Sequence, residues 1–282
     1  MTTTSRSPYD KPVSALTQLW DKAWLRRFVL LLLMCILWEW YARHLANPLM
    51  FPTLIATVQA LGEALINGSL TARILVSIKT LLVGFGFGVL LALLLAVAAV
   101  GNRLGADLLD LCTSMFNPLP AIALLPLALL WFGLGNGSII FVLVHAVLWP
   151  VALSAHAGFA GINPTLRMVG RNYGLRGFRY VAVILIPAAF PQLLTGLRNG
   201  WAFAWRTLIA AELVFGVSSG SGGIGWFIYE NKNQLEIPSV FAGLITVIVI
   251  GIAVENLVFN TVEQRTVVRW GMKNSGGGNN LS

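Results

Sequence analysis

The sequence predicts an all-α polytopic membrane protein with six transmembrane helices. Of its 282 residues, 57% are hydrophobic and 11% are charged, whereas soluble domains carry about 25% charged residues. Apolar runs such as "VLLALLLAVAA" (89–99) lack the alternation of a membrane β-barrel strand. In lipid such runs satisfy their backbone groups as helices. The net charge of +8 is then explained by basic loops, and we expect no nucleic-acid partner.

The N-terminal segment 1–27 is expected to be cytoplasmic and interfacial. Its apolar residues recur at helical spacing and predict a helix along the inner membrane surface: Val13, Leu16, Leu19, Trp20, Ala23 and Trp24. The first span, about 28–45, ends in aromatic residues typical of the membrane interface. No small-residue cleavage site follows, so this span should stay as an anchor.

The remaining elements follow in order. Segment 47–69 is only moderately apolar and predicts an external helix packed on the membrane domain. The other five spans are expected at about 76–100, 119–134, 138–157, 183–215 and 240–262. Segment 102–118 should be a cytoplasmic link or helix extension, 216–239 an external loop, and 271–282 a disordered tail.

Small residues and prolines modify three of these spans. Gly84, Gly86 and Gly88 place small residues four apart, which allows another helix to approach closely in lipid. Three prolines should make the span at 119–134 irregular. Pro187 and Pro191 should kink or divide the fifth span.

The distribution of basic residues predicts the orientation. The expected cytoplasmic parts are 1–27, 101–117, 158–182 and 263–282, and they hold thirteen of the nineteen Lys and Arg residues. The external loops 46–75 and 216–239 hold two, Arg73 and Lys232. Because basic residues favour the cytoplasmic side, both termini should be cytoplasmic.

The largest cytoplasmic loop between spans, 161–182, carries an unusual pattern. In "GINPTLRMVGRNYGLRGFRYVAVILIPAAFP" (161–191), Asn163-Pro164 predicts a helix start and Gly174 a helix stop with positive φ. Four arginines keep this elbow in water, near anionic headgroups: Arg167, Arg171, Arg176 and Arg179. Such an elbow could pass movement from a cytoplasmic partner into the membrane. The alternative is an ordinary basic loop.

The spacing around Gly174 resembles the EAA-loop signature of ABC importer permeases. Nine residues separate Gly174 from Ile184, and Ile186-Pro187 follows one residue later. The chain departs from the signature in two places: Met168-Val169-Gly170 stands where the family has Glu-Ala-Ala, and Ile186 replaces a leucine.

Four further stretches resemble the nitrate/sulfonate/taurine branch of that family. They are "LWEWYARHLANPLMFPT" (37–53), "FNPLPAIALLPLALLWFGLGNGSIIFV" (116–142), "PAAFPQLLTGLRNGWAFAWRTLIAAEL" (187–213) and "GGIGWFI" (222–228). With the loop, the resemblance covers roughly residues 28–270. Five motifs in the right order are a specific signal.

The resemblance implies a type I ABC importer permease fold in a bacterial inner membrane. It implies a homodimer that binds two separate ATPase subunits, which would hold ATP and magnesium, and an extracytoplasmic binding protein that delivers the solute. The helix around 164–174 would be the coupling helix. The residues implied in coupling are Arg167, Met168, Val169, Gly170, Arg171, Tyr173, Gly174, Leu175, Arg176, Ile184 and Pro187.

Motifs for chemistry in the chain itself are weak. No G-x-x-x-x-G-K-[ST] occurs, so ATP hydrolysis and any cofactor should belong to a partner chain. A G-x-G-x-x-G match at Gly220, Gly222 and Gly225 lies in the expected external loop and not in a βαβ unit. His145 and His156 would be about 16 Å apart on one helix, too far to share a metal. A membrane-embedded enzyme is therefore less favoured, and the coupling-loop signature argues against a passive channel or scaffold.

Charged residues at membrane depth are candidates for the solute route. The residues proposed for it are Asn199, Trp201, Trp205, Arg206 and Glu212. A guanidinium at Arg206 would suit an oxyanion such as nitrate, taurine, another sulfonate or an organic acid. The alternative for Arg206 is a structural role, as an ion pair, a helix–helix hydrogen bond or a side chain that snorkels to an interface. We favour such a structural role for Arg198 and Glu255. Relatives of the family also carry neutral or cationic vitamin precursors, so the solute stays open.

Overall fold

This computed structural model describes residues 22–215 and 222–272, and every regular element in those ranges is helical. Within these ranges, five helical segments are long and apolar enough to cross a membrane. They are built on α2 (Ala23–Leu45), α4 (Ser69–Gly101), α7 (Asn136–Ala160), α10 (Ile186–Phe215) and α12 (Ile237–Val254). The count becomes six if one bent helix pair is taken as a single span.

Two of these helices begin earlier than the hydropathy pattern indicated. Helix α2 starts at Ala23, so the end of the expected interfacial helix is already the first turn of the first span. Residues 13–20 of that expected helix lie outside the described residues. Helix α4 starts at Ser69, directly after Gly68 with its φ of 76°.

The third expected span, 119–134, is irregular, as its prolines predicted, and the helical part of it is short. Helix α6 (Leu125–Phe132) has 8 residues and spans about 12 Å at 1.5 Å per residue, far less than a bilayer core. The preceding segment, for which a cytoplasmic link or a helix extension was expected, is the separate helix α5 (Arg103–Phe116), which packs on α4. The two parts, Arg103–Phe116 and Ala121–Phe132, meet at 88°. The bend falls at Pro118 and Pro120, where the chain lacks backbone donors.

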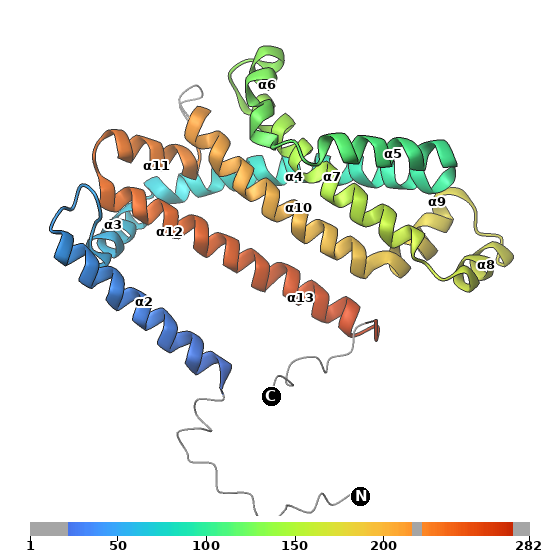
Figure 1. Cartoon of the computed structure of the whole chain (residues 1–282), viewed down its shortest axis with the longest axis horizontal. Coiled ribbons are helices and arrows are strands. Elements are labelled where there is room, and N and C mark those ends of the chain that lie inside the picture. Colours follow the sequence, from blue (N-terminus) through green and yellow to red (C-terminus); the bar gives the residue numbers. More distant parts are fainter. Residues whose placement is uncertain (1–21, 216–221, 273–282) are drawn as a thin grey trace, which may run out of the picture.

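Helix α7 forms the centre of the bundle, between α4 and α10 (Figure 1). Both neighbours approach it through pairs of glycines four residues apart. A Cβ on Gly84 would lie 2.6 Å from Leu143 Cβ, and one on Gly200 would lie 2.8 Å from Val151 Cγ2. Two further glycines make similar close approaches to α7: Gly88 and Gly196. Close helix contact through small residues, as the sequence predicted for α4, therefore holds the core together.

The fifth span is continuous, although the sequence allowed a division at its prolines. Helix α9 (Gly177–Tyr180) runs through a π-helical segment, Val181–Leu185, directly into α10. This wider turn lies just before Pro187, which has no N–H to donate. The last span is extended in the same way, by π-helical turns at Glu255–Phe259 and Gln264–Val268 around α13 (Asn260–Glu263).

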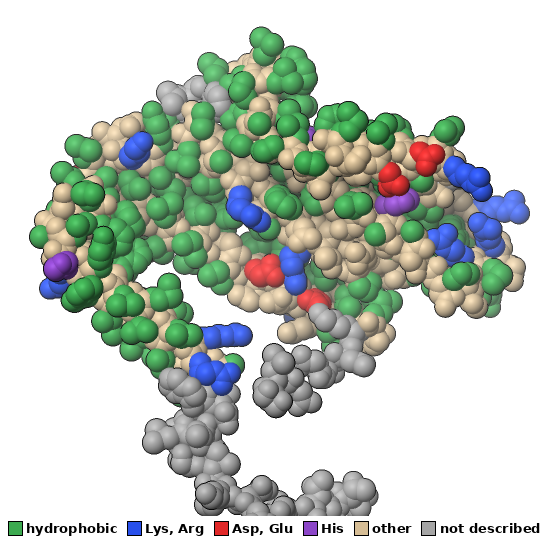
Figure 2. Space-filling view, viewed as in Figure 1, with side chains coloured by type: hydrophobic (Ala, Val, Ile, Leu, Met, Phe, Trp, Pro, Cys, Tyr) green, Lys and Arg blue, Asp and Glu red, His purple; other side chains and the backbone are tan. Residues whose placement is uncertain are grey.

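Short helices close the two ends of the bundle. Helix α8 (Pro164–Asn172) lies at one end, while α3 (Leu54–Ile66) and α11 (Ile224–Asn233) lie at the other (Figure 1). Helix α3 packs on α12 and α4, as predicted for segment 47–69. Lys and Arg side chains gather at the end that carries α8, and hydrophobic side chains cover much of the rest of the visible face (Figure 2).

Candidate functional site

Helix α8 in the loop 161–182 is bounded by local signals at both ends. The Asn163 side chain accepts a hydrogen bond from the Thr165 backbone N–H at 2.8 Å, and Pro164 occupies the first turn. At the other end Gly174 adopts a φ of 72°. Its N–H donates to the Arg171 carbonyl at 2.9 Å, and the Leu175 N–H donates to the Gly170 carbonyl at 3.1 Å. This pair of bonds is the Schellman motif, so the predicted start and stop are both confirmed.

One side of α8 is fixed to the membrane helices. Gly170 is buried, and a Cβ there would lie 3.0 Å from both Ile184 Cγ1 and Tyr180 Cε2. The Arg167 guanidinium donates to the carbonyl of Phe159, the end of α7. These contacts tie the elbow to both α7 and the start of the fifth span.

The other side of α8 is free and chemically mixed. Tyr173 is 82% exposed and Met168 57% exposed. Further exposed residues of the predicted coupling set are Val169, Arg171 and Arg176. The remaining members, Leu175 and Pro187, are half-buried. The residues predicted for coupling thus form two surfaces of the elbow. The outer one is exposed and is apolar and basic, and the inner one contacts the membrane helices.

The five residues proposed for the solute route lie on different faces of the fifth span. Asn199 and Arg206 are exposed. Arg206 donates to the Ala202 carbonyl at 3.0 Å and lies over the Phe203 ring, 5.2 Å from its centroid. Within the described part of the chain Arg206 forms no ion pair.

The two tryptophans of that set point into the protein. Trp205 is buried and donates from Nε1 to the Val247 carbonyl of α12 at 3.3 Å. Trp201 makes edge contacts with Phe85 and Phe259, at centroid distances of 5.5 and 6.3 Å. The structure therefore does not bring them to the exposed face that carries Arg206.

Glu212, the fifth member of the set, is 3% exposed and belongs to a buried network of hydrogen bonds. Ser77 Oγ donates to its carboxylate at 2.8 Å, and the Gly225 N–H donates to it at 2.9 Å. Ser77 in turn accepts from the Ile224 N–H at 2.9 Å. The carboxylate thus caps the N-terminus of α11, where a negative charge is stabilised. It joins α10, α4 and α11.

The hydrogen bonds and close packing around Glu212 also explain why the chain is rich in glycine at the start of α11. Arg73 donates to the Gly222 carbonyl at 2.9 Å and to Glu230 at 3.3 Å. Gly222 and Gly225 of the G-x-G-x-x-G match lie in this packed region, and Gly220 lies outside the described residues. These described glycines allow close packing of α11, so the described part of the motif has a structural role. Sequence reasoning missed Arg73 and Ser77, which lie far along the chain from Glu212.

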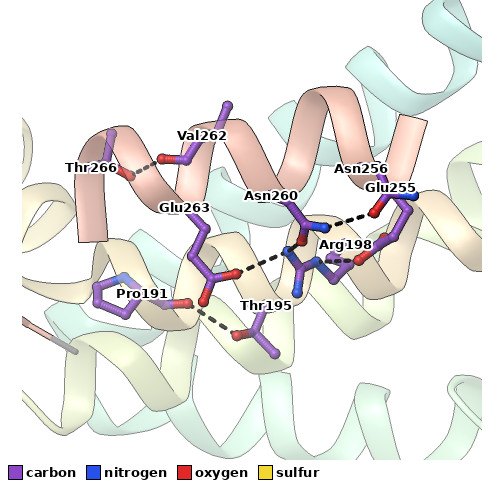
Figure 3. A network of polar contacts seen from close by, with 9 residues as sticks. All are labelled: Pro191, Thr195, Arg198, Glu255, Asn256, Asn260, Val262, Glu263 and Thr266. Carbon is purple, nitrogen blue, oxygen red and sulfur yellow. Dashed lines mark hydrogen bonds and ion pairs between the residues drawn. The ribbon is translucent and has the colours of Figure 1, made fainter. Parts of the chain in front are cut away.

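A second polar network joins the fifth span to the last one (Figure 3). Arg198 forms ion pairs with Glu255 and Glu263, each at 3.1 Å, and donates to Asn260 Oδ1 at 3.0 Å. The Asn260 amide donates to Asn256 at 3.0 Å. The expectation that Arg198 and Glu255 serve in a structural ion pair is therefore confirmed.

Replacing this arginine should destabilise the protein without touching the exposed face of α10. Arg198→Ala leaves Glu255 and Glu263 without their shared cation, so we expect a loss of about 1–3 kcal/mol in unfolding free energy. Thermal unfolding of the purified parent protein and of the variant in detergent measures this loss of stability. The further change of both glutamates to glutamine should recover part of the loss. Equal stability of Arg198→Ala and the parent protein would contradict the assignment.

Comparisons with known proteins agree on one family. The family described as "binding-protein-dependent transport system inner membrane component" matches residues 84–266. A putative ABC transporter permease protein of Methanocaldococcus jannaschii is 30% identical over 78% of this chain and 83% of its own length. The taurine transport system permease protein of Escherichia coli is 26% identical over 80% and 82%. The nitrate import permease protein of a Synechocystis strain is 29% identical over 66% of each chain.

Proposed function

Because this chain belongs to the binding-protein-dependent transport system inner membrane components, we propose that it imports a small anionic solute, driven by a partner's ATP hydrolysis. Such proteins are non-catalytic membrane subunits of ABC transporters, here of the nitrate/sulfonate/taurine type. The solute is nitrate, taurine, another sulfonate or a similar organic acid.

The proposed assembly contains two copies of this chain and two ATPase subunits. An extracytoplasmic binding protein delivers the solute to the end formed by α3 and α11. ATP and magnesium bind to the ATPases, and α8 fits a groove in each. Closure of the ATPases then rocks the two permease copies and opens the route to alternate sides.

The observation that carries this proposal is the form of the α8 elbow. Its inner side contacts Tyr180 and Ile184, and its outer side exposes Met168, Tyr173 and arginines to solvent. A short helix with a free mixed surface and a rigid attachment to two membrane helices suits the transfer of motion from a soluble partner.

The charge pattern supports a cytoplasmic location for the α8 end. Basic side chains gather there (Figure 2), and such residues favour the cytoplasmic side. The last span returns to the same end, since Trp270 contacts Phe190 near the start of α10 at a centroid distance of 5.5 Å. With the bent pair, Arg103–Phe116 and Ala121–Phe132, as one crossing, the proposed total is six and both termini would be cytoplasmic.

The exposed face of α10 supports a polar route. Gln192, Thr195, Asn199 and Arg206 are all exposed and follow helical spacing. Such residues are costly against lipid and usually face a partner or a water-filled path. In the proposed dimer this face borders the path between the two copies.

Transport assays on the reconstituted complex test the function. Proteoliposomes that contain this chain, its ATPase and its binding protein should take up nitrate, taurine or ethanesulfonate only with ATP and magnesium. A complex that imports a neutral or cationic vitamin precursor and no oxyanion would support the second solute class. A chain that is active without an ATPase would contradict the importer assignment.

The guanidinium of Arg206 should matter for uptake and little for folding. Arg206→Ala is expected to lower initial oxyanion uptake about tenfold, because it removes a charge of the opposite sign from the route. Arg206→Lys keeps the charge and should retain more activity. Yield and melting temperature should match the parent protein. Unchanged uptake by Arg206→Ala would make the residue structural.

A further inference from the structure

A cavity of about 210 Å³ lies behind the bend between α5 and α6. Its walls come from three parts of the chain: the bend itself at Asn117 and Pro118, helix α7 at His145 and Trp149, and helix α10 at Phe203 and Thr207. The volume is below the roughly 300 Å³ at which pockets for drug-sized ligands begin. The cavity therefore has room for a small solute only.

One of its walls, helix α7, carries buried polar atoms that lack partners among the described residues. Trp149 is 8% exposed, and its Nε1 has no hydrogen-bond partner among the described residues. The same holds for both ring nitrogens of His145. Buried donors in native proteins nearly always have a partner, so unpaired ones at a cavity point to a ligand or ordered water. An indole nitrogen can only donate, so the partner of Trp149 must accept.

Aromatic rings fix these donors in place. Phe116 stacks on Trp149 with a centroid distance of 5.2 Å and an interplanar angle of 17°. His145 meets Trp149 edge-on at 6.0 Å. Further apolar wall is provided by Pro118 and Phe203. The cavity thus offers hydrogen bonds beside apolar surface, which fits a molecule with a polar group and a short hydrocarbon body.

The charged side chains in and around the cavity indicate whether such a molecule should be an anion or a cation. None of the described residues that line the cavity is acidic. A cation lies over one wall residue, because the Arg206 guanidinium is placed over the ring of Phe203. An aromatic pocket with an acidic neighbour would favour a cation, but this neighbour repels one and attracts an anion.

We infer that this cavity binds the transported solute inside the membrane, and that the solute is a small organic oxyanion, with Trp149 and His145 as hydrogen-bond donors. The inference rests on the proposed function and adds a binding site and a solute class to it. Arg206 would attract the anion at the exposed face, and the cavity behind Phe203 would hold it while the two copies change conformation.

Trp149→Phe is the sharpest test, because it removes the N–H and keeps an aromatic ring. In proteoliposomes with the ATPase and binding protein, we expect initial uptake of radiolabelled ethanesulfonate to fall about tenfold, since hydrogen bonds to charged groups are strong. His145→Phe should have a similar effect. The ATPase activity stimulated by the loaded binding protein should persist, since neither residue belongs to α8.

A matched control is available on the same helix. His156 has a buried Nδ1 without a partner but does not line the cavity. His156→Phe should therefore transport ethanesulfonate at the parental rate. If Trp149→Phe does not assemble, His145→Phe tests the same wall, and Thr207→Val removes a hydroxyl from the α10 wall. Parental uptake by both of these variants overturns the inference.

The outcomes separate the inference from the proposed function. If the parent complex imports ethanesulfonate and the Trp149 and His145 variants do so equally well, the cavity holds water only and the inference is wrong. If the parent complex shows no ATP-driven uptake of any oxyanion, the proposed function fails first. Reduced uptake in the cavity variants, with intact ATPase stimulation, supports both.

Discussion

A Gly174→Val variant is expected to insert into the membrane like the parent protein but to lose most of the proposed ATP-driven uptake. The φ of 72° at this position is unfavourable for any residue with a Cβ and worst for a β-branched one. No heavy atom lies within 4 Å of a Cβ placed there, so the effect comes from the backbone alone. Strain of about 2 kcal/mol would break the hydrogen bonds that end α8, a helix too short to persist by itself.

Uptake and ATPase recruitment measure this effect together. We expect the variant to co-purify with less ATPase, or to allow hydrolysis without uptake, with a loss of uptake of more than about tenfold. Gly174→Asn is the matched control, because asparagine tolerates the left-handed conformation and should keep most activity. Parental uptake by Gly174→Val would show that the corner does not transmit motion.

A Gly225→Ala variant is expected to lose the folded membrane domain itself. A Cβ at this position would lie 2.6 Å from the Ile209 carbonyl oxygen and 2.9 Å from the Leu213 nitrogen, both backbone atoms of α10. Backbone atoms of a packed helix cannot move aside, so α11 would shift and break the hydrogen bond from Gly225 to Glu212. The combined loss should exceed about 3 kcal/mol.

The yield of monodisperse protein and its melting temperature test this expectation. Gly86→Ala is the control, because a Cβ on Gly86 meets no heavy atom within 4 Å. It makes the same chemical change in a neighbouring helix and should be neutral or stabilising by up to about 1 kcal/mol. Equal stability of the two variants would contradict the close contact between α10 and α11.

The comparison of Gly84, Gly86 and Gly88 shows how far the sequence could predict packing. Their spacing indicated a close helix contact, but not the partner or the face. In the structure Gly84 and Gly88 meet α7, whereas Gly86 faces outward. The apolar residues of a membrane helix extend around its whole circumference, so periodicity does not identify the packed side.

The candidate site shows a similar division. Asn163, Pro164 and Gly174 act through the backbone of their immediate neighbours, so their roles could be predicted from spacing. The partners of Glu212 and Arg198 could not be predicted from spacing. Ser77 reaches Glu212, and Glu255 reaches Arg198, only when the helices have packed. The cavity at His145 and Trp149 could not be predicted either, because its walls come from three separate parts of the chain that meet only in the packed structure.

Composition and local backbone preferences were enough to predict the helical membrane class, most of the spans and the elbow that ends at Gly174. The prolines indicated an irregular third span, but its angle of 88°, the burial of Glu212 and the exposure of Arg206 emerged only when the helices were placed together. Those features depend on which helix faces lie together. Packing contacts between distant segments set that arrangement, and no local pattern in the chain encodes it.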